Sequence, residues 1–355
     1  MSKKGEVSIF YGGFSANIGG VNIHLGSLKR GLERLGYIVY AHTLDDLPFG
    51  LKYLPHSLEK LVNFFWFPLG FVYKGVATKI LFRFFFTRKV DFLIFEDIYL
   101  SWNSRIPSLT MLHAVWSDNL QAFTTTPKQI NRLKIKEIKI IENITHPIAT
   151  VSEPYRKYLI STHFSNKIIK RIEVISLGIE QSLFDDIEMS RDPQKSNAMI
   201  CTAALEARKN IIFLLEVFKQ LYSLNKSYTL TIIGDGPDRK KIERFIEQND
   251  LPVTLLGRLP RHELIKELFQ HEIYVHTSTK ESFSYALLEA KLAKLKTIAF
   301  MGLEVPDEFI DLKMKSFDAE EWCTAIIKEN FVSQTIDPNN FNLETMSRKT
   351  LVMSK

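Results

Sequence analysis

The sequence predicts an α/β protein made of two Rossmann-like, doubly wound parallel-sheet domains. Its 355 residues exceed what one compact core usually holds. Apolar runs of strand length alternate with helical stretches in both halves, as in parallel sheets covered on both faces. A polar stretch at 181–197 carries a proline and separates the halves. We expect the strands' carboxyl ends to border a central ligand cleft.

The strand-like runs set the order of elements. Six lie in the first half, at 7–11, 37–43, 91–97, 108–116, 146–152 and 172–178. Five lie in the second half, at 198–206, 228–236, 253–259, 272–279 and 296–302. These runs place an N-terminal domain at 1–185 and a C-terminal domain at 186–335. The last segment, 336–355, either returns to the N-terminal domain or is a frayed tail.

Composition narrows the class of protein. With 45% hydrophobic and 24% charged residues, the chain is typical of folded soluble proteins. Cys201 and Cys323 are too few for a disulfide framework, and the first residues lack a secretory signal, so we expect a cytoplasmic protein. The net charge of +6 favours anionic partners. Because no nucleic-acid-binding module is recognisable, we expect no nucleic-acid partner.

Residues 61–89 combine many aromatic side chains with five cations, Lys74, Lys79, Arg83, Arg88 and Lys89. Pro68 and these charges interrupt the segment too often for a membrane span, which needs about twenty nearly uninterrupted apolar residues. Two interpretations stay open. The segment either lies in the interface of an anionic bilayer or forms a buried helix pair with its cationic ends in water.

Three turns at predicted strand ends carry groups that suit an anionic ligand. Gly19 and Gly20 lie where a loop meets a helix, so that backbone N–H groups are open to approach. Arg208 and Lys209 precede another helix and can neutralise a diphosphate without a metal. Gly234 begins the turn "GDGP", which lacks the third glycine of a dinucleotide fingerprint. The sequence shows no Asp-x-Asp pair and no His/Cys cluster with metal-ligand spacing.

Glu281 and Glu289 flank a short apolar run after a predicted strand. With a helix beginning near Ser282, they lie roughly 12 Å apart along its axis and about 80° apart around it. That separation is too large for one shared proton. The two acids either hold two ends of an extended ligand or are ordinary components of a helix and its N-terminal turn.

Taken in order along the chain, these motifs resemble the retaining GT-B glycosyltransferases of family four, the glycosyl transferases group 1. The resemblance extends from "GGVNIH" through "VSEPYRKYL" and "ISLGIEQSLF" to "ESFSYALLE", a Glu-x7-Glu element that is its most specific part. It implies two Rossmann-like domains, a nucleotide diphosphate sugar as donor, and a glycan or lipid-linked acceptor. It also implies catalysis without a metal or other cofactor.

The resemblance assigns roles to individual residues. Glu281 matches the acid that contacts the donor sugar, and Glu289 the acid that holds the ribose. Lys209, with Arg208 beside it, matches the cation on the diphosphate, and His113 matches a histidine near the donor sugar. The remaining donor-binding candidates, which act through backbone or turn geometry, are Gly19, Gly20, Gly234, Ser282, Phe283 and Ser284.

The sequence departs from the family pattern at several of these motifs. Ala204 replaces an arginine that is common in the first basic motif, and Ser282 and Ser284 stand where glycines are frequent. Lys294 and Lys296 occupy the place of a Gly-x-Pro turn. These departures keep one rival open, a catalytically inactive protein that binds a nucleotide or glycan. A nicotinamide oxidoreductase fits the same alternation of elements but lacks the fingerprint glycines.

Overall fold

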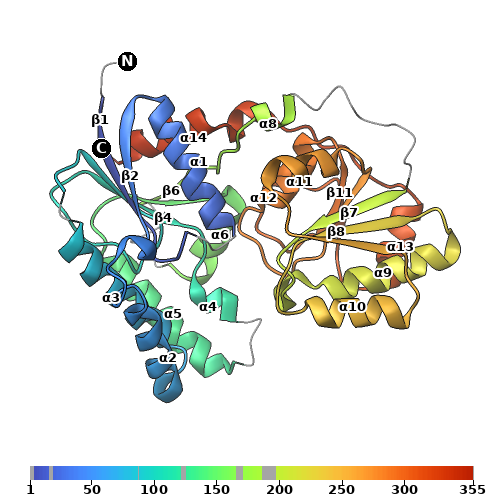
Figure 1. The fold of residues 1–355 in the computed structure, drawn as a ribbon, viewed down its shortest axis with the longest axis horizontal. Coiled ribbons are helices and arrows are strands. Elements are labelled where there is room, and N and C mark those ends of the chain that lie inside the picture. Colours follow the sequence, from blue (N-terminus) through green and yellow to red (C-terminus); the bar gives the residue numbers. More distant parts are fainter. Residues whose placement is uncertain are drawn as a thin grey trace. The chain divides into compact units, whose positions relative to one another are not determined.

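The computed structural model describes residues 4–15, 19–86, 88–120, 125–164, 171–185 and 197–354. The chain divides into two compact units (Figure 1). The first comprises Met1–Glu180 with Asn339–Lys355, and the second comprises Gln181–Pro338. Each unit contains one six-stranded parallel sheet, which confirms the predicted α/β class.

The first sheet has the strand order β2-β1-β3-β4-β5-β6. All six strands lie within the predicted apolar runs or extend them by two residues. Their bounds are β1 Gly5–Phe10, β2 Tyr37–His42, β3 Phe92–Phe95, β4 Ser108–Leu112, β5 Ile148–Thr150 and β6 Ile172–Val174. In the register, Val7 of β1 pairs with Val39 on one side and with Phe92 on the other. The sequence between the strands forms helices because parallel neighbours require long crossover connections.

Seven helices accompany the first sheet in the described part of this unit. They are α1 Gly20–Arg34, α2 Leu54–Trp66, α3 Gly70–Phe85, α4 Trp116–Asn119, α5 Pro127–Asn143, α6 Glu153–Thr162 and α14 Leu343–Met353. Phe82 of α3 is fully buried against Phe10 and Phe95 of the sheet. The C-terminal helix α14 lies beside α1 (Figure 1), and the carbonyl oxygen of Phe341 accepts a hydrogen bond from the Ile179 N–H at 2.7 Å.

The second sheet has the order β12-β11-β10-β7-β8-β9. Its strands are β7 Ala198–Thr202, β8 Thr229–Ile233, β9 Val253–Gly257, β10 Ile273–His276, β11 Lys296–Phe300 and β12 Leu312–Met314. The helices are α8 Ser182–Asp185, α9 Ile211–Leu224, α10 Arg239–Gln248, α11 Arg261–Leu268, α12 Tyr285–Leu292 and α13 Ala319–Ile327. Alternate strand residues such as Met199 and Cys201 join one core with α9 and with Trp322 of α13.

Residues 61–89 form neither a fully buried pair of helices nor, among the described residues, a membrane-spanning helix. The segment contains the end of α2 and all of α3, which pack against each other. In the described part of the chain, no helix combines the length and the apolar character needed to cross a membrane. Several aromatic side chains of this pair are nevertheless exposed, most of all Phe64 at 82% and Phe84 at 76%.

We predict that Gly31→Ala weakens the docking of α14 on α1. A Cβ atom at Gly31 would lie 2.2 Å from Ser347 Oγ and 2.7 Å from the Leu343 carbonyl oxygen. Overpacking of this kind costs about 1–3 kcal/mol. On the same helix, a Cβ at Gly26 meets only Arg30 Nη1 at 3.5 Å, so Gly26→Ala should gain up to about 1 kcal/mol of helix propensity. Urea unfolding followed by circular dichroism compares the two, and equal stabilities would contradict this packing.

Candidate functional site

In each sheet the strand order reverses at one place, and ligands of open parallel sheets bind beyond the strand ends at this switch point. In the second sheet β7 lies between β8 and β10. The residues that follow β7 and β10 therefore border the expected ligand position. These two segments, 203–210 and 277–284, contain the predicted residues Arg208, Lys209 and Glu281.

Backbone and side-chain hydrogen bonds join the two segments. The Thr277 hydroxyl donates to the Lys209 carbonyl at 2.8 Å, and the Thr279 N–H donates to the Arg208 carbonyl at 3.0 Å. Arg208 returns a guanidinium N–H to the Lys280 carbonyl at 3.1 Å. The cations and the acid are therefore held by a rigid frame, although they are about 70 residues apart in sequence.

Glu281 lies at the centre of a partly buried ionic cluster, in which its own side chain is 12% exposed. Lys209 Nζ donates a hydrogen bond to Glu281 Oε1, Arg208 Nη1 is 3.8 Å from Oε2, and His276 Nε2 is 3.5 Å from Oε1. Burial alone would raise the pKa of Glu281, but Lys209, His276 and Arg208 together hold it well below its usual range. Burial lowers the pKa of His276, and Glu281 opposes this shift. Glu281 is thus a fixed carboxylate facing two cations.

Helix α12 begins at Tyr285, not near Ser282 as predicted. Ser284 is its N-cap residue, with a φ of +67° and a hydroxyl that accepts from the Leu287 N–H at 3.3 Å. This left-handed conformation favours glycine, the residue frequent here in the family, and costs a serine of order 1–2 kcal/mol. Glu281 therefore lies in the loop before the helix, and the helical estimate of its distance from Glu289 does not apply.

The neighbouring candidates differ in what they offer a ligand. The Phe283 side chain is buried against the rings of Tyr285 and Phe309, so Phe283 can act only through its backbone. Ser282 is half-buried in the loop that carries Glu281.

Glu289 is buried in α12 and pairs with Arg261, a residue that sequence reasoning missed. Arg261 Nη2 lies 2.6 Å from Glu289 Oε1, and the Glu289 side chain is 6% exposed. Burial raises the pKa of Glu289, and Arg261 opposes the shift. Arg261 is the first residue of α11, about thirty residues before Glu289 in the sequence. No local sequence motif could therefore predict the contact.

Gly234 has a structural requirement of its own. Its φ is +141°, and a Cβ atom there would lie 1.8 Å from the Ala203 carbonyl oxygen. Its N–H donates to the Gly257 carbonyl at 2.7 Å. Only glycine lets the turn after β8 approach the turn after β7 this closely. Ala204, in that second turn, is exposed and offers no charged group.

The first unit has its switch point between β1 and β3, and a second polar cluster lies there. Gly19 caps α1 and Gly20 begins it, and a Cβ at Gly19 would meet nothing within 4 Å among the described residues. Glu96 and His113 directly follow β3 and β4.

Glu96 connects two histidines in this cluster. Its Oε2 is 2.7 Å from His113 Nε2 and 3.3 Å from Nε2 of His24, which comes from α1. Burial would raise the pKa of Glu96, but the two histidines lower it to about 2. Burial lowers the pKa of His113, and Glu96 partly restores it. The sequence predicts His113 but gives no sign of His24 or Glu96.

These three side chains could also hold a metal ion, because their ligand atoms lie within 4.8 Å of one another. Two histidines and one carboxylate are a donor set that zinc accepts. The sequence shows no metal-ligand spacing here, because the three residues are too far apart in the chain for spacing to reveal the group. The shorter of the two contacts, 2.7 Å between Glu96 Oε2 and His113 Nε2, is an ordinary hydrogen bond and needs no metal.

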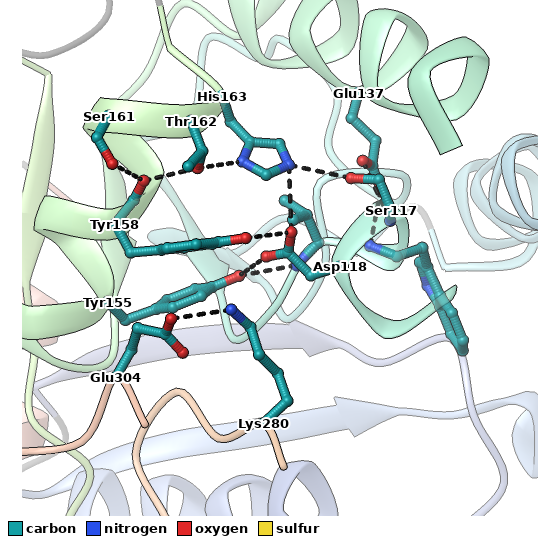
Figure 2. Close-up of polar contacts among 12 residues, drawn as sticks. Ser117, Asp118, Glu137, Tyr155, Tyr158, Ser161, Thr162, His163, Lys280 and Glu304 are labelled. Atoms are coloured by element: carbon teal, nitrogen blue, oxygen red, sulfur yellow. Dashed lines mark hydrogen bonds and ion pairs between the residues drawn. The ribbon is translucent and has the colours of Figure 1, made fainter. Parts of the chain in front are cut away.

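A buried network supports the short helix α4, which follows His113 closely (Figure 2). Glu137 of α5 accepts hydrogen bonds from the N–H of Trp116 at 2.7 Å and from the Tyr99 hydroxyl at 2.7 Å. His163 Nε2 lies 3.1 Å from Ser117 Oγ and 3.5 Å from Asp118 Oδ1. Because serine and aspartate share one ring nitrogen, the group lacks the relay geometry of a Ser-His-Asp triad. It instead fixes the backbone beyond His113.

The structure thus brings Arg208, Lys209 and Glu281 into direct contact, and Gly19 and Gly20 start the helix that also carries His24. Glu289 lies in the same unit as Glu281 but forms a separate pair with Arg261.

Comparison with known proteins identifies the type of protein. Residues 185–328 match the model of the family described as Glycosyl transferases group 1. Most of the second unit thus matches a Glycosyl transferases group 1 domain, and the chain has the GT-B fold. It is 24% identical over 313 residues to one subunit of the human phosphatidylinositol N-acetylglucosaminyltransferase, in an alignment that covers 83% of this chain and 61% of the relative. It therefore spans less than two thirds of that protein.

Other matches agree with this glycosyltransferase assignment. The GtfA subunit of the UDP-N-acetylglucosamine–peptide N-acetylglucosaminyltransferase of Streptococcus gordonii is 25% identical, over 45% of this chain and 31% of that protein. The Anabaena protein HepE, solved with UDP and glucose, has a TM-score of 0.66 at 15% identity and 98% coverage of both chains. Sucrose-phosphate synthase from Thermosynechococcus elongatus has a TM-score of 0.71 at 16% identity, covering 98% of this chain and 94% of that chain.

We predict that Glu137 makes the stability of the protein depend on pH. Burial raises the pKa of Glu137 to about 7. The pKa of Glu137 is higher in the folded than in the unfolded protein. Its protonation therefore stabilises the fold fully at a pH below the unfolded pKa, and this contribution is lost as the pH rises through about 7. Relative to Glu137→Gln, the wild type should lose up to about 1.4 kcal/mol per pH unit between these values. Urea unfolding at pH 5.5 and 8 measures this difference, and parallel pH profiles would contradict it.

Proposed function

We propose that this glycosyltransferase moves a hexose from a nucleotide diphosphate sugar to an acceptor hydroxyl, with retention at the anomeric carbon and without a metal. The observation that carries the proposal is the partly buried cluster of Lys209, Arg208 and Glu281 at the switch point of the second sheet. It offers two cations to a diphosphate and one fixed carboxylate to sugar hydroxyls.

Charge separation is the chemical problem that this cluster addresses. In the transition state the sugar becomes oxocarbenium-like while the diphosphate departs. Lys209 and Arg208, preorganised beside the start of α9, stabilise the departing phosphate. Glu281 orients the sugar and stabilises its developing positive charge. In the retaining route proposed here, the leaving phosphate accepts the proton of the acceptor hydroxyl, and Glu281 forms no covalent intermediate.

The remaining candidates complete the donor site in this proposal. Glu289 accepts hydrogen bonds from the ribose, and the backbone of Ser282, Phe283 and Ser284 approaches the sugar and phosphate. Gly19, Gly20 and His113 serve the acceptor and the sugar from the first unit. UDP-N-acetylglucosamine is the first donor to test, because the Streptococcus gordonii relative is named for it and the human relative for N-acetylglucosamine, and a solved neighbour binds UDP.

The acceptor proposed is a lipid-linked or other glycan hydroxyl, reached from the cytoplasmic side at an anionic membrane surface. The human relative is named for phosphatidylinositol. In this chain, the exposed aromatic side chains of α2 and α3 support a position at a membrane.

We expect Glu281→Gln and Glu289→Gln to fail in different ways. Glu281→Gln should lower the transfer rate by roughly 10²–10³-fold, since one preorganised electrostatic group is lost, yet it should still bind UDP. Glu289→Gln should weaken UDP binding by roughly tenfold through the ribose contact. Donor turnover and calorimetric UDP titration separate the two effects.

Glu247→Gln, at an exposed position of α10, is the matched control for this pair. Full transfer by Glu281→Gln would reject the proposed site. UDP binding without transfer or donor hydrolysis by the wild type, across a panel of sugars, would favour the inactive binding protein instead.

We also predict that excess EDTA leaves transfer unchanged, because Lys209 and Arg208 neutralise the diphosphate directly. Donor turnover after chelation and desalting tests this. Loss of turnover that Mg²⁺ or Mn²⁺ restores would contradict the role given to the two cations. A different result would place a required metal on His24, Glu96 and His113: turnover that only Zn²⁺ restores after chelation, and that Zn²⁺ fails to restore in His24→Ala.

A further inference from the structure

Helix α3 carries apolar side chains on two faces, and only one of them is buried in the protein. Phe82 packs into the core, and Gly75 lies so close to Tyr99 that an added Cβ would be 2.2 Å from the Tyr99 Cβ. On the outer face, a stripe at helical spacing is exposed by 38–76%. This stripe comprises Tyr73, Val76, Ile80 and Phe84. Such a continuous exposed stripe marks an interaction surface.

The end of α2, the helix that packs against α3, exposes three consecutive aromatic residues. Phe64, Phe65 and Trp66 are exposed by 82%, 63% and 54%. The rings of Phe64 and Phe65 contact each other edge to face, with 4.9 Å between their centroids. They gain no burial in the protein from this arrangement, which leaves them available to a less polar phase.

A hollow of about 410 Å³ lies between these aromatic residues and the beginning of α5. Its walls are residues 63–67, and Lys128, Gln129 and Arg132 from the first turns of α5. The first turn of α5 contains no acid, and among the described residues neither Lys128 nor Arg132 has a carboxylate within 4.0 Å. Two uncompensated cations thus face the hollow near the positive end of a 17-residue helix.

We propose that this hollow binds the phosphate of an anionic phospholipid headgroup while Phe64, Phe65, Trp66 and the α3 stripe enter the bilayer interface. The inference rests on the membrane part of the proposed function and assigns a headgroup site to it. A lysine and the planar guanidinium of an arginine suit a phosphate, and aromatic rings beside them suit the interface just below it. Exposed Lys136 and Lys139 continue the positive charge along α5.

The test compares charge reversal at the hollow with the same reversal elsewhere. Wild-type protein should co-sediment with vesicles of phosphatidylcholine and phosphatidylserine, and far less with pure phosphatidylcholine. The double variant Lys128→Glu/Arg132→Glu should lose at least tenfold in partitioning. The control, Lys240→Glu/Lys241→Glu, makes the same charge change on exposed positions of α10 and should bind nearly as well as wild type. Equal losses in both double variants would overturn the headgroup site.

A second readout follows the aromatic residues directly. Phosphatidylserine vesicles should shift the emission of Trp66 to shorter wavelength, and Trp66→Phe should remove that shift. Glycerol phosphate in solution should not cause it. A shift with glycerol phosphate alone, or none with vesicles, would contradict insertion beside a lipid headgroup. Calorimetric UDP binding by Lys128→Glu/Arg132→Glu should remain at the wild-type value, so that loss of the donor site is recognised separately.

Discussion

The ionic cluster around Glu281 is the constraint on which the candidate site depends. The Glu281 side chain is 12% exposed, and Lys209, Arg208 and His276 compensate the cost of removing its charge from water. The same contacts tie the segment after β7 to the segment after β10, the two strands between which the sheet order reverses. In the proposed function, stability and ligand recognition use the same groups, and a diphosphate shares Lys209 with Glu281.

The switch points of the two sheets carry different electrostatics. In the second unit two cations accompany the buried acid, which suits a phosphate-bearing ligand. In the first unit two histidines contact Glu96, and burial raises the pKa of the adjacent Asp97 to about 6. Two neighbouring acids disfavour a phosphate and favour hydroxyls or a developing positive charge. This charge difference agrees with the proposal that the second unit binds the donor diphosphate and the first unit serves the acceptor.

Much of the fold could be predicted because hydrophobic periodicity is local, whereas contacts between distant elements leave no local signal. The β12 strand escapes prediction because Leu312–Met314 is too short to show alternation. The predicted start of α12 is three residues early because a serine at positive φ is not recognisable in a sequence. The basic turn and Glu-x7-Glu are visible as motifs, but the partners Arg261 and Glu96 are supplied by tertiary packing alone.

The central claim is that the Lys209–Glu281 cluster is the subsite for an activated sugar. A crystal structure of the protein with a non-hydrolysable UDP-sugar analogue tests it most directly. The account predicts the diphosphate within hydrogen-bond distance of Lys209 Nζ and a sugar hydroxyl on the Glu281 carboxylate, with the ribose at Glu289. An analogue bound elsewhere, with Lys209 still paired only to Glu281, would contradict it.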